Sequence, residues 1–331
     1  MGIRGLTSLL NKHAPDCVTT VGFGSLTARA VAIDSSILMY KYSHVSKGHE
    51  HASLVGFMNR TLNYLTNGIL PVYVFDGKPP DEKSHILKER REAKRKVYQK
   101  IEDLEKEHET EGGEWRLDRI KELRRQITKV TAEQSNDVQA MLRFLGIPVV
   151  DSPGDAEKTC AFLQTQKAVD YTMTDDTDAF AFGADKVIKF RLVDYKLAVW
   201  DLEKILSGLG LTYDSFVDLC ILCGCDYCQT IPKVGPVTAY RHIKKWGDIE
   251  SVIENNPKLS LPTDYITKIM KSRSIFKDNG GEQRVQAFAI GALREEELRS
   301  FLTDRGFQAK TISAYLKRAK KGHNRIMKVH K

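Results

Sequence analysis

The clearest hydrophobic pattern in the chain is a pair of short apolar runs that each end in a carboxylate. Residues 28–34, Ala-Arg-Ala-Val-Ala-Ile-Asp, end at Asp34, and residues 70–76, Leu-Pro-Val-Tyr-Val-Phe-Asp, end at Asp76. Nearly unbroken apolar runs of this length are typical of strands that are buried on both faces of a parallel sheet. A helical pattern follows each run, so we predict a strand and then a helix in both places.

Four further segments have the length and composition of strands, and helical patterns lie between several of them. They are residues 147–151, 169–174, 186–190 and 196–200. This alternation predicts an α/β domain with a mostly parallel central sheet flanked by helices. In such sheets ligands bind at the carboxyl ends of the strands, where Asp34 and Asp76 are placed. The ordinary alternative for each Asp is that it caps the following helix.

A highly charged segment, residues 78–134, interrupts this alternation. It is rich in Lys, Arg and Glu, and Gly112-Gly113 divides it into two helical stretches. Mixed charges at helical spacing are typical of a solvated hairpin laced with ion pairs. Residues 83–96, however, are predominantly basic. We therefore expect that part to be able to contact phosphates while the remainder is solvated.

The C-terminal part of the chain has two further features that suit a polyanionic partner. Residues 231–236, Ile-Pro-Lys-Val-Gly-Pro, precede a helical pattern. A turn of this kind presents backbone N–H groups at a helix start, where a phosphate can bind. The tail, residues 316–331, is rich in Lys and Arg. We predict that it is a solvated or disordered end that could touch nucleic acid.

Four of the six cysteines lie close together in the pattern C-x2-C-x-C-x2-C. They are Cys220, Cys223, Cys225 and Cys228. The spacing resembles that of metal ligands. Zinc ligands usually come as two separated pairs, whereas this stretch begins as an apolar helix, so we favour ordinary thiols over a zinc or iron–sulfur site. Without a secretory signal, structural disulfides are not expected.

Composition and charge favour a polyanionic partner and argue against a membrane-spanning or secreted protein. The chain has 331 residues, of which 41% are hydrophobic, enough for a sizeable core. The formal net charge of +8 favours a polyanionic partner. No apolar run approaches the roughly 20 residues that span a bilayer, and the first residues lack the apolar stretch of a signal peptide. We expect an intracellular protein that does not engage a membrane.

Seven acids at predicted strand ends and helix starts form the candidate catalytic set. They are Asp34, Asp76, Asp155, Glu157, Asp176, Asp178 and Asp226. Side chains two residues apart share a face of an extended segment, so each of the two close pairs could direct both carboxylates at one point. A like-charge contact at about 4 Å costs on the order of 4 kcal/mol at an effective dielectric of 20, so convergence requires bound cations or protonation. The alternative is that these are surface acids and helix caps among the 43 acidic residues.

The oxygen-only ligand set and the spacing of the acids indicate which cations would bind. Hard oxygen ligands favour Mg²⁺ or Mn²⁺ over zinc. Two such ions about 4 Å apart can activate a water and stabilise the leaving oxygen of a phosphodiester. The sequence therefore predicts a site for two Mg²⁺ or Mn²⁺ ions.

The motifs around these acids resemble the flap endonuclease family, within the wider XPG nuclease family. The similar segments are residues 1–6 (Met-Gly-Ile-Arg-Gly-Leu), 31–36 (Val-Ala-Ile-Asp-Ser-Ser), 71–80 (Pro-Val-Tyr-Val-Phe-Asp-Gly-Lys-Pro-Pro) and 217–228 (Val-Asp-Leu-Cys-Ile-Leu-Cys-Gly-Cys-Asp-Tyr-Cys). The resemblance is clear over about residues 1–250 and loose beyond them. It implies a PIN-like 5′ nuclease fold with a helical arch and a C-terminal helix-two-turns-helix region.

The resemblance also implies roles for residues at the active site. The seven acids match the family's metal ligands, although the family usually has Glu at the position of Asp155, which is one methylene shorter. Lys83 and Arg90 match the two basic residues at the base of the arch that position the scissile phosphate. Tyr40 matches the aromatic side chain on which a base near the cut stacks.

Other residues match the family's DNA-binding positions. Gly2 would lie beside the active site at the amino terminus. Lys233 and Gly235 fall in the helix-two-turns-helix turn, where backbone groups and a K⁺ ion hold the uncut duplex strand. Lys233 stands at a usual Gly, and Val237 and Thr238 stand at a usual basic pair, which puts the duplex grip and its K⁺ dependence in question.

The implied activity is that of a structure-specific 5′ flap endonuclease with 5′–3′ exonuclease activity, acting on branched or flapped DNA in replication and repair. The alternatives are a non-catalytic branched-DNA-binding protein of the same fold, and an exonuclease or Holliday-junction resolvase of the same family. We find no clamp-binding peptide of the form Gln-x-x-hydrophobic-x-x-aromatic-aromatic near the C-terminus, so a sliding-clamp interaction is unsupported. We expect a monomer, in the nucleus if the organism is eukaryotic and otherwise wherever DNA is replicated.

These patterns divide the chain into five expected regions. They are an N-terminal nuclease region with the start of the arch (1–107), the remainder of the arch (108–135), an internal nuclease region (136–226), a helix-two-turns-helix and C-terminal helical region (227–315) and the basic tail (316–331).

Overall fold

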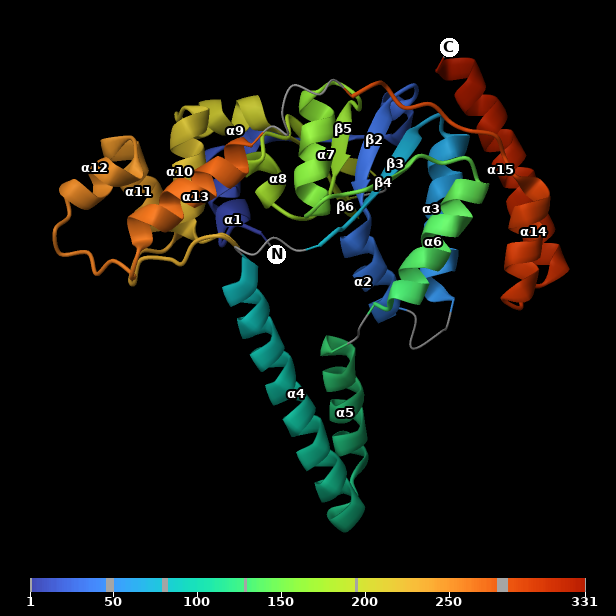
Figure 1. Cartoon of the computed structure of the whole chain (residues 1–331), viewed down its shortest axis with the longest axis horizontal. Helices are drawn as coiled ribbons and strands as arrows, with labels where there is room; N and C mark the ends of the chain where they lie inside the picture. The colour runs from blue at the N-terminus through green and yellow to red at the C-terminus, as the bar shows by residue number, and fades with distance from the viewer. Residues whose placement is uncertain are drawn as a thin grey trace.

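A seven-stranded sheet forms the centre of the molecule (Figure 1). The computed structural model describes residues 2–45, 51–78, 83–127, 130–193, 196–278 and 285–330. The strands are β1 (Val18–Val21), β2 (Ala30–Asp34), β3 (Leu70–Phe75), β4 (Val149–Asp151), β5 (Tyr171–Met173), β6 (Lys186–Val193) and β7 (Lys196–Asp201). Their order across the sheet is β1-β7-β6-β5-β2-β3-β4.

The strand pairing confirms the predicted mostly parallel sheet. β2 is parallel to β3 and β5, β4 is parallel to β3, and β6 is parallel to β5, whereas β7 is antiparallel to both β6 and β1. Sequence analysis missed β1, because it has only four residues and its two central threonines, Thr19 and Thr20, are exposed. A strand that buries so little apolar surface leaves almost no hydrophobic pattern.

Helices cover both faces of the sheet and extend beyond it. They are α1 (Leu6–His13), α2 (Ser35–Val45), α3 (Ala52–Thr66), α4 (Ser84–Glu111), α5 (Glu114–Gln126), α6 (Ala132–Phe144), α7 (Ala156–Thr165), α8 (Asp178–Ala181), α9 (Leu202–Leu209), α10 (Tyr213–Cys223), α11 (Pro236–Trp246), α12 (Ile249–Glu254), α13 (Tyr265–Lys277), α14 (Glu295–Asp304) and α15 (Ala309–Val329). Val31 and Ile33 of β2 pack into a core with α3, α6 and α15, while Ala32 faces a second core with α7. This alternation explains why β2 is apolar almost throughout.

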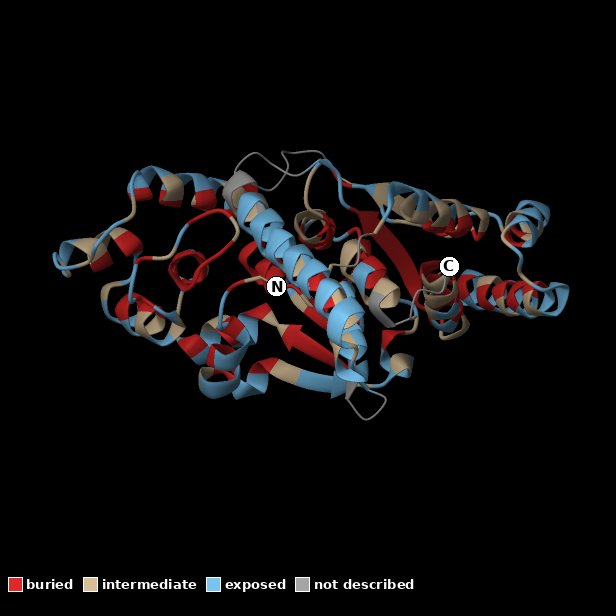
Figure 2. Cartoon of the chain, turned by 90° about the horizontal axis from the view of Figure 1, so that it is seen from below, coloured by how far each residue is buried: buried red, intermediate tan, exposed pale blue. Residues whose placement is uncertain are grey.

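The charged segment forms a long helical hairpin, α4 and α5, that projects from the body (Figure 1). Most of α4 is exposed (Figure 2), as the solvated-hairpin interpretation expects. The two helices nevertheless share a small core of Ile101, Leu104, Ile120 and Leu123. Between them, Gly112-Gly113 adopts positive φ angles of 70° and 101°, a conformation that glycine adopts without steric penalty.

The prediction of a solvated or disordered basic tail at 316–331 is wrong for residues 316–329. They belong to α15, which packs along α3 and contributes Leu316, Ala319 and Ile326 to the core. At Gly322, a Cβ atom would come within 2.6 Å of Leu65, so the two helices are in close contact. The Lys and Arg residues occupy the opposite side of an amphipathic helix, and the count of charges concealed its apolar stripe. The expected boundary at 315/316 therefore falls inside a continuous helix.

A further core lies beside the sheet, where α10, α11 and α13 pack with α1 and α8. All six cysteines are buried and free. Among the described helices, none is long and apolar enough to cross a membrane alone, although α9 and α10 would pass that test as a bent pair.

Candidate active site

The carboxyl ends of neighbouring parallel strands place the first two predicted acids next to each other. Asp34, the last residue of β2, is almost fully buried and accepts a 2.8 Å hydrogen bond from the Thr174 hydroxyl. Its other oxygen accepts from the Ser36 backbone N–H at 3.1 Å, so Asp34 also caps α2. Asp76 follows β3 and accepts from the backbone N–H of Ala156 at 2.8 Å, which ties the β3 end to the start of α7.

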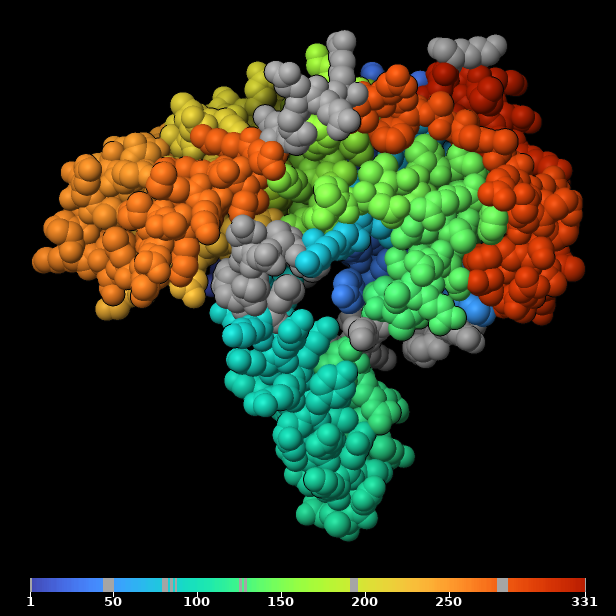
Figure 3. Space-filling view, in the orientation of Figure 1, coloured from blue at the N-terminus to red at the C-terminus, as the bar shows by residue number. Residues whose placement is uncertain are grey.

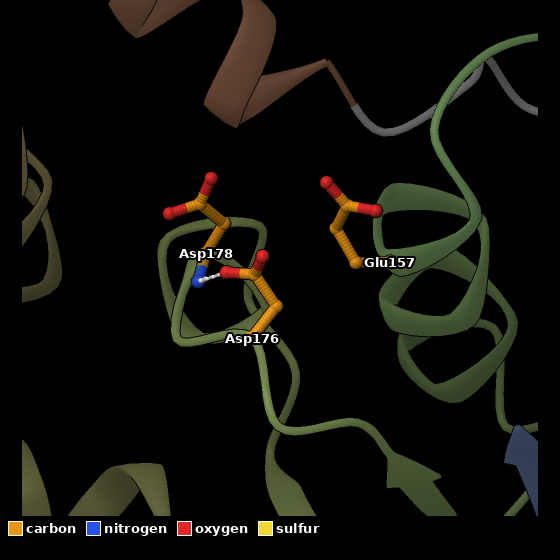
Figure 4. Close-up of side chains that lie close together, drawn as sticks. All are labelled: Glu157, Asp176 and Asp178. Atoms are coloured by element: carbon orange, nitrogen blue, oxygen red, sulfur yellow. Dashed lines mark hydrogen bonds between the residues drawn. The ribbon is translucent and has the colours of Figure 1, made fainter. Parts of the chain in front are cut away.

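The closest cluster in the site consists of Glu157, Asp176 and Asp178 (Figure 4). One oxygen from each carboxylate lies within 4.8 Å of one oxygen from each of the others. Asp176 and Asp178 come from the loop after β5 and the start of α8, and Glu157 comes from the first turn of α7. The Asp178 backbone N–H donates to Asp176 at 3.0 Å and holds that carboxylate in place.

The remaining acids meet the arch. Lys83 Nζ lies 2.9 Å from Asp155, 3.5 Å from Glu157 and 3.7 Å from Asp226. An Arg90 guanidinium nitrogen lies 2.9 Å from the Asp226 carboxylate. The structure thus brings the two predicted basic residues to the acids, although they lie some distance from them in the sequence.

The two close pairs of acids behave differently from the simple prediction. Asp176 and Asp178 converge as expected. Asp155 is instead the N-cap residue of α7, where the backbone changes from extended to helical, and it points toward Lys83 and Tyr227. The Tyr227 hydroxyl donates to Asp155 at 2.8 Å. Asp155 is therefore not among the three most closely grouped oxygen ligands.

Burial and mutual repulsion make this site unfavourable for negative charge. Burial raises the pKa of Asp34 to about 7, and the charge of Asp76 adds to that rise. Burial likewise raises the pKa of Glu157 and of Asp178 well above the usual range, with Asp176 contributing to both. Without cations, these groups retain protons that a solvated carboxylate would lose.

The donor set fits hard divalent cations. One oxygen of Asp178 is buried and has no hydrogen-bond partner in the described part of the chain. An unpartnered buried carboxylate oxygen is costly unless a ligand satisfies it. Three converging carboxylates with no nitrogen or sulfur ligand suit Mg²⁺ or Mn²⁺. Glu157, Asp176 and Asp178 are the residues that would hold such an ion most directly.

The predicted position of Gly2 beside the acids agrees with the structure. Gly2 has a φ of 91°, and a Cβ at this position would lie 2.1 Å from an Asp176 carboxylate oxygen. Any side chain here would displace that carboxylate. Tyr40 lies on α2, the helix that starts directly after Asp34, and its side chain is exposed.

The other two predicted DNA-binding residues, Lys233 and Gly235, lie in a separate region directly before α11. Lys233 has a φ of 67°, in the left-handed region that favours glycine, and Gly235 is the N-cap residue of α11. The carbonyl of Gly235 accepts the Ala239 backbone N–H at 2.8 Å, which begins the helix. A lysine thus occupies a backbone conformation suited to the Gly that the family usually has there.

Sequence reasoning missed two residues that orient the acids. They are Thr174, which bonds Asp34, and Tyr227, which bonds Asp155. Each is next or nearly next to a predicted acid, but neither has a charge to mark it. Their partners are 140 and 72 residues away, so no local pattern indicates these contacts.

Comparisons with known proteins agree with this geometry. The XPG N-terminal domain matches residues 1–97, and the XPG I-region matches residues 146–226. Flap endonuclease 1 of Zea mays is 36% identical over 98% of this chain and 88% of its own length. Flap endonuclease 1 of Micromonas commoda is 35% identical over 92% of this chain and 85% of its own length.

Solved structures share the fold at lower sequence identity. The catalytic core of Rad2 in complex with DNA substrate has a TM-score of 0.71 and 23% identity, and the match covers 99% of this chain and 100% of that one. Flap endonuclease-1 from Methanococcus jannaschii has a TM-score of 0.64 and 20% identity, with 94% and 96% covered. The matched families and the long similarity to flap endonucleases show that the chain belongs to the flap endonuclease family of metal-dependent nucleases, within the wider XPG family.

Proposed function

We propose that the chain is a structure-specific 5′ flap endonuclease, with 5′–3′ exonuclease activity, that hydrolyses phosphodiesters of branched DNA in replication and repair. The observation that carries this proposal is one acidic site, in which seven carboxylates from five separate segments act on one another and meet two cationic residues at the base of a helical arch. The cofactor is proposed to be two Mg²⁺ or Mn²⁺ ions per site.

The chain's own residues have distinct parts in this chemistry. Divalent cations bound by the acids would supply a water of lowered pKa and neutralise charge on the leaving oxygen. Lys83 and Arg90 place positive charge at the edge of the site, where the phosphate accumulates negative charge during cleavage. Thr174 and Tyr227 fix the orientations of Asp34 and Asp155.

The arch provides a route for a single strand. The space-filling view shows an opening between the base of the arch and the body (Figure 3). The α4 side of the arch begins with the basic stretch 83–96. We place the 5′ single strand there, with a base near the cut stacked on Tyr40.

The uncut duplex lies along the turn of Lys233 and Gly235, with K⁺ as its proposed ligand. The place of action follows from this substrate: the nucleus in a eukaryotic cell, and otherwise wherever DNA is replicated.

Cleavage of a double-flap substrate tests the proposal. With Mg²⁺, the wild-type protein should cut near the junction and leave a 5′ phosphate, and EDTA should stop the reaction. Asp178→Ala should abolish cleavage while DNA binding stays measurable. Asp304→Ala, at an exposed acid at the end of α14, should cut at the wild-type rate.

Three results would contradict the proposal or shift it to an alternative. A wild-type protein that binds the flap but never cuts it would be the non-catalytic binder. A preference for four-way junctions over flaps would indicate a resolvase. An Asp178→Ala protein as active as the Asp304→Ala protein would remove the acids from the mechanism.

A further inference from the structure

Two cysteines flank the turn that carries Asp226. Cys225 and Cys228 form an antiparallel bridge pair, so Asp226 and Tyr227 are the two residues of a tight hairpin turn. Residues opposite each other in an antiparallel pair have Cα atoms about 4.5–5.5 Å apart. Disulfides join residues whose Cα atoms are about 4.4–6.8 Å apart. The backbone therefore already holds these two cysteines at disulfide separation.

Both cysteines of this bridge are buried, with 7% of Cys225 and 2% of Cys228 exposed. The Cys228 thiol donates to the carbonyl of Gln229 at 3.5 Å, a weak interaction. A disulfide to Cys225 would remove this interaction, because the sulfur would no longer carry a proton.

Both cysteines line the same cavity. It has a volume of about 340 Å³, and its other walls include Arg4, Glu89 and Leu261. Glu89 belongs to α4, so the cavity lies at the base of the arch. Cys220 and Cys223 belong to the same sequence motif but do not line this cavity. The motif thus divides into two cysteines on α10 and a cavity-lining pair beyond it.

We propose that Cys225 and Cys228 are a peroxide-sensitive pair, and that the disulfide between them lowers nuclease activity by displacing Asp226. One sulfur attacks a peroxide oxygen, the O–O bond breaks, and a sulfenic acid and one water form. The second thiol attacks that sulfur, the S–S bond forms, and a second water leaves. Two thiols and one hydrogen peroxide thus give one disulfide and two waters, with two electrons passing from sulfur to oxygen.

The position of the pair connects its redox state to the acidic site. Asp226 lies inside the ring that the disulfide would close, and its carboxylate contacts Arg90 at 2.9 Å. Tyr227, in the same ring, donates to Asp155. Closing so small a ring changes the turn that carries both residues, so two contacts of the active site change together. The effect on activity rests on the proposed function, whereas bond formation does not.

The experiment uses the full chain and hydrogen peroxide. The reduced protein is first assayed for cleavage of a flap substrate with Mg²⁺. It is then treated with millimolar peroxide in EDTA and freed of both reagents. One portion is assayed again for cleavage, and another is digested and mapped by mass spectrometry. We expect the peptide containing residues 225–228 to lose two hydrogen masses. We expect cleavage to fall about tenfold, the scale of effects seen when the support of a metal ligand changes. Dithiothreitol should restore both.

Two variants distinguish oxidation of this cysteine pair from oxidation elsewhere in the chain. Cys228→Ala should keep its activity in peroxide, whereas the matched variant Cys223→Ala, altered at the nearby buried thiol on α10, should lose activity like the wild type. An unchanged mass of the 225–228 peptide would overturn the proposal without using any variant. A mapped disulfide with undiminished cleavage would overturn the link to Asp226. A reduced protein that never cuts would refute the proposed function and leave the mapping result valid.

Discussion

Lys83 Nζ lies 2.9 Å from a carboxylate oxygen of Asp155, inside the acidic site rather than on the solvent side of the arch. Only 7% of the Lys83 surface is exposed. Burial opposes its charge, but the carboxylates of Glu157 and Asp155 more than compensate and raise the pKa of Lys83 above its usual value. Lys83 therefore stays cationic throughout the ordinary assay range and links the arch to the metal ligands.

Replacing Lys83 should affect the chemical step more than binding. For Lys83→Ala we expect single-turnover cleavage to fall about 10²- to 10³-fold, because a positive charge aimed at the reacting phosphate is lost. Flap affinity should change by less than about tenfold, the effect of 1.4 kcal/mol. Lys310→Ala, at an exposed lysine near the start of α15, is the control and should remain near the wild-type rate. Equal losses in the two variants would contradict this role.

The metal-free protein should lose stability as the pH rises from about 4 to 7. The pKa of Asp34 is 3.8 when unfolded and about 7 when folded. Between these values the unfolded chain releases a proton that the folded chain keeps, so the free energy of unfolding falls by a few kcal/mol. Thermal unfolding in EDTA across this range measures the effect. Mg²⁺ at pH 8 should restore stability.

Asp34→Asn tests the origin of that pH dependence. It removes the buried titrating charge, so in EDTA the variant should be more stable than the wild type at pH 8 and similar to it at pH 4. It should also gain less stability from Mg²⁺. Asp304→Asn serves as the exposed control. A wild-type unfolding curve that does not move between pH 4 and 8 would contradict the assignment.

Arg273 stabilises the C-terminal region through two acids. Its guanidinium donates to Asp218 at 2.6 and 2.5 Å and to Glu250 at 2.6 Å. Asp218 is buried, so Arg273→Ala leaves an unpaired internal carboxylate and should cost about 3–5 kcal/mol. Arg299→Ala, which breaks two partly exposed pairs with Glu295 and Glu296, should cost no more than about 1 kcal/mol. Urea unfolding distinguishes these values, and equal costs would mean that the burial of Asp218 is unimportant.

Lys233 holds a backbone conformation that favours glycine, and so does Lys167, with a φ of 57°. Lys→Gly at either position should relieve strain and stabilise the chain by up to about 1 kcal/mol. Of the two variants, only Lys233→Gly should weaken duplex binding. It should also reduce the slope of binding against salt concentration by about the amount that one phosphate contact contributes. Binding measured at several salt concentrations checks this. Identical DNA binding by both variants would remove Lys233 from the duplex site.

The sequence predicted the centre of the fold because its strands are buried on both faces. β2 and β3 appear as apolar runs ending at or before an Asp, and the structure has them within two residues of the predicted limits. Periodicity did not indicate β1, which is half exposed, or the docking of α15, whose charges dominate its composition. Hydrophobic pattern reports only the surface that an element buries, so short edge strands and charged amphipathic helices are the elements most easily missed.

The sequence by itself determined which groups were available for chemistry: seven carboxylates at the ends of strands and the starts of helices, and cationic residues at the base of a helical hairpin. Only the tertiary structure decided how they meet. It placed Glu157 with Asp176 and Asp178, turned Asp155 toward Lys83 and Tyr227, and buried Asp34 deeply enough to raise its pKa. Distances between side chains and the loss of solvent around them depend on how segments up to about 190 residues apart pack together. Local sequence patterns record the identity of each group but contain no information about that packing.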